Sequence, residues 1–541
     1  MFSTDLQIPI LDLVIIVLYM LGILVVGILS TRHQKMTGDT YFLAGRSLGW
    51  VTVGAALFAS NISTIHVVGL AASGYREGIV WGNFELAAGF TLIMLGLVFA
   101  PFYFRSRIGT LPEFLERRFS SGSRSFLAFM AILAAIFIHI GMSLYAGATV
   151  FEQFFGINVI ASILIISVVT GIYTVLGGLK AVVITETIQT VVLIVGAVIV
   201  TFLAIMALPE HGITTMAEFE NAVKPGQLNL LHTDNSVGLA WYAVLLGYPV
   251  MGIWYWCTDQ TIVQRVLAAK SEHDAQIGPL FAGFIKVLPL FILVLPGTIG
   301  YVLFQDRIGD DANQVLPVLI TELVPTGLKG LISAGLLAAL MSTIAAALNS
   351  CGTLVAVDIV ARIRPQTTDQ TQVKIGRWSA VVIMLAAMAW STQGGRFTSI
   401  FEAVQVLGAD LAPPITAVFL WGIFWRRGTS QASLATLFFG LVLGVVAFVV
   451  DLPLIGDEKL LTNVWGIPFM LQAWWGFVIC SVVFVAVSLL TPAPSAEKVD
   501  GLTWDNPLSV LKRSSYSGRT DPRIVAGALA LTLILVYVLL R

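Results

Sequence analysis

Long apolar stretches, separated by short polar connections, follow one another along the whole chain. Fourteen of them reach the roughly 20 residues that a helix needs to cross a bilayer core of about 30 Å. The longest polar connections, 209–236 and 491–522, are too short to fold as separate domains. The pattern predicts an all-α integral membrane protein of about 14 transmembrane helices. These start near Ile8, Gly49, Ile79, Ser125, Ile157, Val182, Val237, Gly278, Lys329, Ser379, Ile400, Ser430, Ala473 and Arg523.

Lysine and arginine are distributed unevenly over the predicted connections. Twenty-two of the 30 follow the odd-numbered spans, seven lie on the opposite face, and Lys286 lies inside a span. Because positive residues collect on the cytoplasmic side of a membrane, we expect the odd-numbered spans to end in the cytoplasm. Fourteen spans then place both termini on the extracellular or periplasmic side of a plasma (inner) membrane.

The composition excludes several classes of protein. Of the 541 residues, 57% are hydrophobic and only 11% are charged, as expected for a membrane protein. A net charge of −1 leaves no basic surplus that would bind nucleic acid. The three cysteines are odd in number, far apart and surrounded by apolar residues, so we expect them to be buried packing residues. Hydrolase and phosphate-binding motifs are absent from the sequence, so enzyme activity is not expected.

Two predicted spans are interrupted by residues that weaken a helix. The second carries Ser60, Asn61 and His66 near its middle, where the backbone is either locally unwound or held in a continuous helix by neighbouring spans. The seventh contains Pro249 and Gly252, followed by three aromatic residues. Interrupted spans five apart are typical of transporters built from an inverted repeat, with the substrate held between the two breaks. Aromatic anchoring at the membrane surface is the alternative for the seventh span.

Several polar side chains lie within other spans. Glu85 and Lys286 carry opposite charges at depths where an isolated charge is costly, so we expect them to neutralise each other across a wet cavity and to hydrogen-bond a polyhydroxylated ligand. Gln405 adds an uncharged donor and acceptor. Ser342 and Thr343 are adjacent hydroxyls, which either bond to their own helix or, facing unwound carbonyls, supply neutral oxygens to a monovalent cation.

Four stretches resemble the sodium/solute symporter family, and within it the sodium/glucose cotransporter branch, over nearly the whole chain. They are 58–62 (FASNI) with His66, 254–270 (WYWCTDQTIVQRVLAAK), 339–344 (ALMSTI) with 348–350 (LNS), and 411–425 (LAPPITAVFLWGIFW). The flanking segments 39–47 (DTYFLAGRS) and 173–181 (YTVLGGLKA) agree with it.

The resemblance implies roles for individual residues. The side chains that would bind a sugar are Asn61, His66, Glu85, Tyr255, Trp256, Lys286 and Gln405. The gates would be formed by Leu70, Phe84 and Phe401 on the outer side and by Tyr255 on the inner side. A sodium ion would be held by the carbonyls of Ala59, Ile62 and Ala339 and by the hydroxyls of Ser342 and Thr343.

The resemblance also implies a LeuT-like core of two inverted five-helix repeats. We expect the first transmembrane helix and a cytoplasmic loop in 1–48, the first repeat in 49–208 and an extracellular connection in 209–236. The second repeat would occupy 237–427, and three C-terminal helices with the cytoplasmic loop 491–522 would occupy 428–541.

Four positions depart from the family pattern. Gly252 stands where sugar-transporting relatives often have Thr or Asn, so one hydrogen bond to the sugar would be missing or mediated by water. Relatives that carry two sodium ions have hydroxyls at the positions of Ala345 and Ala346 and an aspartate at that of Glu186. We therefore predict one sodium ion per sugar.

Together these features predict a sodium-coupled symporter that imports glucose or galactose by alternating access, with the lipid bilayer, the sugar and sodium as its partners. Myo-inositol or another polyol is the alternative substrate. Sialic acid and proline are less favoured, because the chain offers no additional cation for a carboxylate. A sugar sensor or channel on the same fold is a further alternative, and coupling to protons through His66 stays open.

Overall fold

The computed structural model describes residues 9–235, 237–393, 400–451, 459–504 and 518–541. The side chains of 153–155, 400–403 and 519 are not among the described parts. Apart from two isolated bridges, Leu48 with Ala269 and His232 with Ala240, the regular structure described is helical. The protein is therefore an all-α molecule, as the sequence predicts.

The helices account for all fourteen predicted spans. Eleven described helices are long and apolar enough to cross a membrane, and the bent pair α3 and α4 makes a twelfth span. The helix α10 contains two of the predicted spans. The seventh predicted span is formed by α12, the π-helix η6 (Ile253–Thr258) and α13. In chain order the spans are α1 (Ile10–Leu29), α3 (Trp50–Asn61) with α4 (Thr64–Glu77), α5 (Gly82–Met94) with α6 (Ala100–Ser106), α8 (Ser121–Ala134) with α9 (Ser143–Phe155), α10 (Val159–Ala207), α12 (Trp241–Gly252) with α13 (Gln260–Leu267), α14 (Glu272–Ile285) with α15 (Leu295–Ile308), α17 (Leu328–Thr353), α19 (Asp369–Ser391), α20 (Ile400–Phe424), α21 (Ser430–Val450), α22 (Phe469–Leu490) and α24 (Pro522–Leu539).

Gly178 divides α10 into the fifth and sixth spans. Its backbone (φ 62°, ψ −159°) is not helical, and a Cβ atom there would lie 2.5 Å from the carbonyl oxygen of Tyr41. Only glycine combines a positive φ with such a close approach. The two halves of α10 therefore have independent directions, although no residues separate them.

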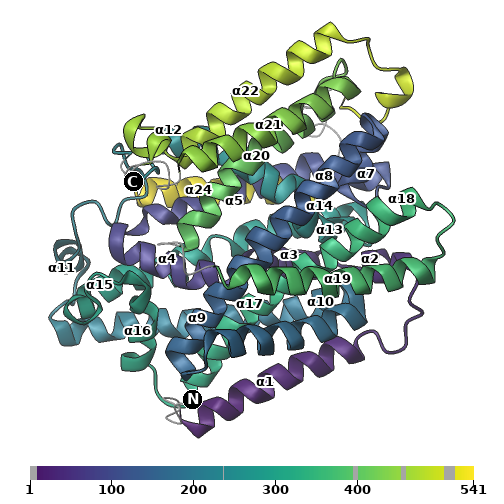
Figure 1. Ribbon diagram of the computed structural model, residues 1–541. Helices are drawn as coiled ribbons and strands as arrows, with labels where there is room; N and C mark the ends of the chain where they lie inside the picture. Colours follow the sequence, from purple (N-terminus) through teal and green to yellow (C-terminus); the bar gives the residue numbers. More distant parts are fainter. Residues whose placement is uncertain (1–8, 236, 394–399, 452–458, 505–517) are drawn as a thin grey trace.

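Short helices cap the two ends of the molecule. In Figure 1, α11 (Met216–Ala222) and α16 (Val315–Leu323) lie at the left, while α7 (Leu111–Arg118) and α18 (Ala361–Ile363) lie at the right. Asp12 in the first turn of α1 accepts hydrogen bonds from the backbone N–H groups of Gly327 and Gly330, and Leu540 after α24 accepts one from Leu230. The first turn of α1 and the end of α24 thus lie at the same end of the molecule as α11, as an even number of spans requires.

The core is formed by α17, which is buried along nearly its whole length and packs against both halves of α10. Its buried alanines, among them Ala338, Ala339 and Ala345, allow close approach of neighbouring helices. Cys257, Cys351 and Cys480 are free and buried, which confirms that they are packing residues.

The seventh span is broken later than the sequence predicts. The helix α12 continues through Pro249 to Gly252 and then winds more loosely as the π-helix η6 (Ile253–Thr258). The break itself comes at Asp259 (φ −83°, ψ 126°), which starts α13. Because membrane helices tolerate proline when local winding adjusts, Pro249 and Gly252 do not end the helix.

Candidate functional site

The second span is unwound between Asn61 and Thr64, which confirms the first of the two interpretations of its polar residues. Ile62 is extended (φ −77°, ψ 101°), and α3 and α4 meet at an angle of 63°. Ser63 caps α4, and its backbone N–H donates to Nδ1 of His66 at 3.4 Å. The last carbonyls of α3 are therefore freed from a continuous helix.

The two hydroxyls of α17 face these carbonyls. Ser342 Oγ donates to the carbonyl oxygens of Ala59 (2.7 Å) and Ala339 (3.0 Å). Thr343 Oγ1 lies 3.2 Å from the carbonyl oxygens of both Ser60 and Ala339. Both side chains are buried. Five neutral oxygens from two helices thus gather at one place.

This donor set fits a sodium ion, since hard cations prefer several oxygen ligands and a neutral shell suits a single charge. Ser342 and Thr343 would turn their hydroxyl oxygens toward the ion, together with the carbonyls of Ala59 and Ala339. Ile62, the other predicted ligand, is the first extended residue after α3. The structure adds the carbonyl of Ser60, which contacts Thr343 and which the sequence analysis did not include.

A cavity of about 100 Å³ lies between the breaks in the second and seventh spans. It has room for several water molecules or a small polar solute. All seven predicted sugar-binding residues line it. The complete lining is Asn61, Ser63, Ile65, His66, Phe84, Glu85, Ile138, His139, Ser143, Tyr248, Met251, Gly252, Trp254, Tyr255, Trp256, Lys286, Thr343, Val404, Gln405 and Gly408.

The buried charges in this cavity are paired, as the sequence predicts. Lys286 forms an ion pair with Glu85 and donates to Asn61 Oδ1 at 2.6 Å. All three side chains are buried. The Lys286 ammonium also lies 5.6 Å from the centre of the Trp256 ring, a cation–π distance. The site thus presents hydrogen-bonding groups without a net charge from this pair.

Aromatic rings form the other walls. Tyr255 and Trp256 meet edge to face, with ring centres 5.1 Å apart. Phe84 stacks on Trp81 and on Phe469 at 5.7 and 6.0 Å, which links the cavity wall to the C-terminal helices. Flat rings beside hydrogen-bonding groups suit a ligand that has apolar faces and a polar edge.

The predicted gate residues occupy different places. Phe84 and Tyr255 line the cavity, whereas Leu70 is fully buried within the core on α4 and does not line it. Phe401 lies in the first turn of α20, and its side chain is outside the described residues.

The sequence analysis missed several lining residues, including His139 and Ser143. Both lie in the fourth span, one helical turn apart, on the π-helix η4 (Ala135–Met142) and the start of α9. A histidine within an apolar span is itself a signal of function, and this signal would have identified His139.

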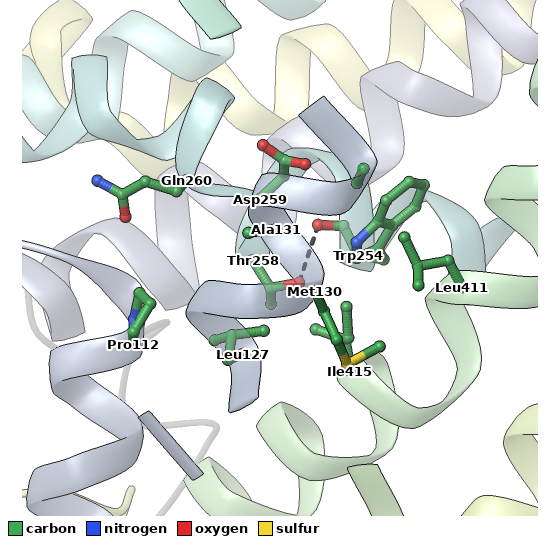
Figure 2. Close-up of a pocket in the computed structure, with 11 residues that line it drawn as sticks. Pro112, Leu127, Met130, Ala131, Trp254, Thr258, Asp259, Gln260, Leu411 and Ile415 are labelled. Atoms are coloured by element: carbon green, nitrogen blue, oxygen red, sulfur yellow. Dashed lines mark hydrogen bonds between the residues drawn. The ribbon is translucent and has the colours of Figure 1, made fainter. Parts of the chain in front are cut away.

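A second, smaller hollow of about 10 Å³ lies next to the cavity and shares Trp254 with it. Figure 2 shows Met130, Trp254, Leu411 and Ile415 around it, with Thr258 donating to the carbonyl oxygen of Trp254 at 2.8 Å. Pro112 of α7 lies at its far side. The hollow is therefore on the side of the cavity that faces α7.

The departures from the family pattern also have structural consequences. Gly252 lines the cavity, and a Cβ atom there would lie 2.6 Å from Thr91 Cγ2, so the close approach of Thr91 depends on glycine. Glu186 is buried, pairs with Arg265 at 2.6 Å and accepts a hydrogen bond from Ser60 Oγ at 2.9 Å.

Comparisons with known proteins agree with this arrangement. A model of the sodium:solute symporter family matches residues 41–440. Sodium/myo-inositol cotransporter 2 of Oryctolagus cuniculus is 34% identical, over 91% of this chain and 78% of its own length. The Bos taurus sodium/mannose cotransporter is also 34% identical (96% and 93% covered), and Oryctolagus cuniculus sodium/glucose cotransporter 1 is 32% identical (89% and 79%).

Solved structures share the fold. A Na⁺-coupled sialic acid symporter in a substrate-bound outward-open state aligns with a TM-score of 0.76 at 21% identity, over 90% of this chain and 99% of that one. A nucleobase-cation-symport-1 family transporter aligns with a TM-score of 0.55 at 15% identity, over 87% and 99%. The chain therefore belongs to the sodium:solute symporter family and has its LeuT-like, all-helical membrane fold.

Proposed function

We propose that the protein imports a neutral, polyhydroxylated ring, glucose or galactose first, together with one sodium ion. Membership of the family makes it a multi-pass, sodium-coupled solute symporter and not an enzyme. The observation that carries the finer proposal is the cavity. Seven side chains from five separate spans converge there, and each is a type that hydrogen-bonds or stacks on a sugar.

The electrostatics of the cavity support a neutral solute. Lys286, the buried cation of the site, is already paired with Glu85 and bonded to Asn61. A carboxylate substrate would have to compete for this lysine, which would leave Glu85 buried without a partner. Sugars and cyclic polyols avoid that cost, because hydroxyls can donate to Glu85 and accept from Lys286 at once.

Myo-inositol is the second candidate substrate. It is favoured by the name of similar relatives, sodium/myo-inositol cotransporter 2 at 34% identity. Other relatives of comparable identity carry the names mannose and glucose. All of these solutes present a six-membered ring with several hydroxyls, which is the chemistry that the cavity suits.

Two features support a stoichiometry of one sodium ion. Ala345 and Ala346, which follow the hydroxyl pair on α17, are buried and carry no oxygen in their side chains. Glu186 forms an ion pair with Arg265, so the charge of its carboxylate is already neutralised. A second cation would have to break this pair inside the protein, at a cost of several kcal/mol.

Sodium and solute are physically linked through the broken second span. The carbonyls of Ala59 and Ser60 contact the hydroxyl pair, while Asn61, the next residue, contacts Lys286 in the cavity. Thr343 belongs to both sites, because it lines the cavity and also contacts the carbonyl of Ser60. Sodium that orders this segment also orders the sugar site and favours the outward-open form. Each sodium ion that moves inward across 100 mV releases about 2.3 kcal/mol, which drives the solute uphill.

Uptake into proteoliposomes tests this proposal. Labelled glucose, galactose and myo-inositol are offered under an inward sodium gradient, with potassium in place of sodium as the control. We expect concentrative uptake of a hexose only with sodium. If the protein took up myo-inositol in preference to both hexoses, its substrate would be myo-inositol and not a hexose. Sodium-dependent binding without uptake would identify a sensor, and equal uptake in potassium would disprove sodium coupling.

The orientation and the division of the chain are part of the same proposal. We place both termini on the extracellular or periplasmic side of the plasma (inner) membrane, and the two five-helix repeats in 49–208 and 237–427. An epitope tag after Arg541 should be accessible to a protease added outside intact cells, and a tag in 491–522 should not. The reverse pattern would invert the topology.

A further inference from the structure

A buried histidine and a buried carboxylate meet at the floor of the substrate cavity. His139 Nε2 lies 3.3 Å from Asp259 Oδ2, and the two residues are only 7% and 6% exposed. His139 lines the cavity, and Asp259 lines the smaller hollow that faces α7. The contact therefore lies between the two spaces.

The two spaces follow the same helices. Along α20, Gly408 lines the cavity, and Leu411 and Ile415, further along, line the hollow. Along the fourth span, His139 lines the cavity and Ala134 lines the hollow. The hollow thus extends the cavity toward Pro112 of α7 (Figure 2). This end of the molecule carries Arg117 and Arg118 of α7, and we predict it to be cytoplasmic.

We propose that the contact between His139 and Asp259 is a latch that keeps this route closed, and that its release opens the cavity toward the cytoplasm. This inference rests on the proposed transport function. The histidine belongs to the fourth span and the carboxylate to the seventh, in the two different proposed repeats. A solute can pass between these spans only if they separate, and their separation breaks the contact.

The positions of the two residues suit a latch. Asp259 is fixed to α13, because its Oδ1 accepts a hydrogen bond from the Thr261 backbone N–H at 2.6 Å. His139 lies on the π-helix η4, a winding that often marks functional sites. Breaking a polar contact is costly in a dry interior and cheap once water enters. The closed and the hydrated form are therefore two distinct states.

Gln260, next to Asp259, supports the same route. Its Oε1 accepts a hydrogen bond from the backbone N–H of Leu111 at 2.9 Å, which ties α7 to α13. Its Nε2 is buried and has no partner among the described residues, and the side chain lines the hollow. A water molecule that enters the hollow could accept a hydrogen bond from this Nε2 group.

The ring of Tyr255, on η6, lies next to this contact, with its centre 6.0 Å from that of the His139 ring. Tyr255, the predicted inner gate residue, therefore lies beside the latch.

Cysteine labelling tests the latch without any substrate. The reporter is Ala134→Cys, which places a thiol on the hollow at a position that is only 4% exposed. A charged, membrane-impermeant maleimide is added to each side of the reconstituted protein. The three native cysteines are buried, and the protein without the reporter gives the background.

In the reporter protein, His139→Ala and Asp259→Asn should each raise the labelling rate from the predicted cytoplasmic side roughly three- to tenfold. Asparagine keeps the cap on α13, so the fold is retained. His139→Gln keeps a side chain that can donate a hydrogen bond, and should raise the labelling rate less than His139→Ala does. The control His211→Ala, at the opposite end of the molecule, should leave the labelling rate unchanged.

Two results would overturn the latch. One is an unchanged labelling rate in both His139→Ala and Asp259→Asn, at an unchanged melting temperature. The other is a labelling rate in His139→Gln that is at least as high as the rate in His139→Ala. Sodium-driven uptake by the parent is measured separately, so a failure of the transport proposal is recognised independently of the latch.

Discussion

At the scale of single residues, side chains in the site already contact oxygen atoms of neighbouring spans. Ser342 reaches the carbonyls of Ala59 and Ala339 at 2.7 and 3.0 Å. Lys286 is shared between Glu85 and Asn61. The first group joins two spans and the second joins three, through polar contacts that are buried from water, so the loss of one atom should have a large effect.

Ser342→Ala should weaken the response to sodium. The substitution removes one of the five neutral oxygens, and a lost ligand of this kind corresponds to about tenfold or more in affinity. Sodium activation of uptake is the measurement, with the sodium concentration for half-maximal rate rising by that factor. Ser333→Ala, also buried on α17, is the matched control and should leave the sodium response unchanged. An equal response in both variants would remove Ser342 from the sodium site.

Glu85→Gln should destabilise the protein as well as abolish uptake, because it leaves Lys286 buried without its counter-charge. Breaking such a pair costs about 3–5 kcal/mol. The double variant Glu85→Gln with Lys286→Met removes both charges and should recover much of the melting temperature without recovering uptake. An unchanged melting temperature in Glu85→Gln would mean that the pair is hydrated, and would contradict the description of Glu85 and Lys286 as a buried ion pair.

At the scale of helices, two breaks in the spans lie where function is proposed. The second span is bent by 63° beside the hydroxyl pair, and the seventh breaks at Asp259 beside the cavity floor. The polar residues of the second span indicate the first break as one of two interpretations. The sequence misplaces the second, because the break depends on the π-winding of η6 and on the capping of α13, not on Pro249 alone.

Gly178→Ala should disrupt the turn between the fifth and sixth spans. Alanine would adopt a positive φ at a cost of roughly 1–2 kcal/mol, and its Cβ would press against the carbonyl of Tyr41. We expect a lower melting temperature in detergent. Gly171→Ala in the same helix meets nothing within 4 Å and should be neutral or slightly stabilising. Equal melting of the two variants would contradict this account of the turn.

At the scale of the whole molecule, coupling requires that both ligands favour the same arrangement of the spans. The unwound segment between α3 and α4 touches both sites, through Ala59 and Ser60 on one side and Asn61 on the other. Ligands that share one ordered segment influence each other reciprocally.

Sodium and sugar should therefore raise each other's affinity by the same factor. Calorimetric titration of the purified protein measures sugar binding with and without sodium, and sodium binding with and without sugar. Typical coupling of 1–3 kcal/mol corresponds to roughly 5- to 150-fold. Ser342→Ala should reduce this factor from both directions. Sugar binding that is independent of sodium would exclude coupling through the shared segment.

The sequence by itself determined the fold class, the number of spans and seven of the residues that line the cavity. Apolar length is decisive in a bilayer, because backbone polar groups must be satisfied within each helix, and polar residues at that depth are too costly to be incidental. Tertiary structure alone decided which polar groups meet. Three contacts illustrate this: Ser60 with Thr343, Glu186 with Arg265, and His139 with Asp259. The residues that they join are 79 to 283 positions apart in the sequence. No local pattern records such contacts, since they depend on how whole helices pack.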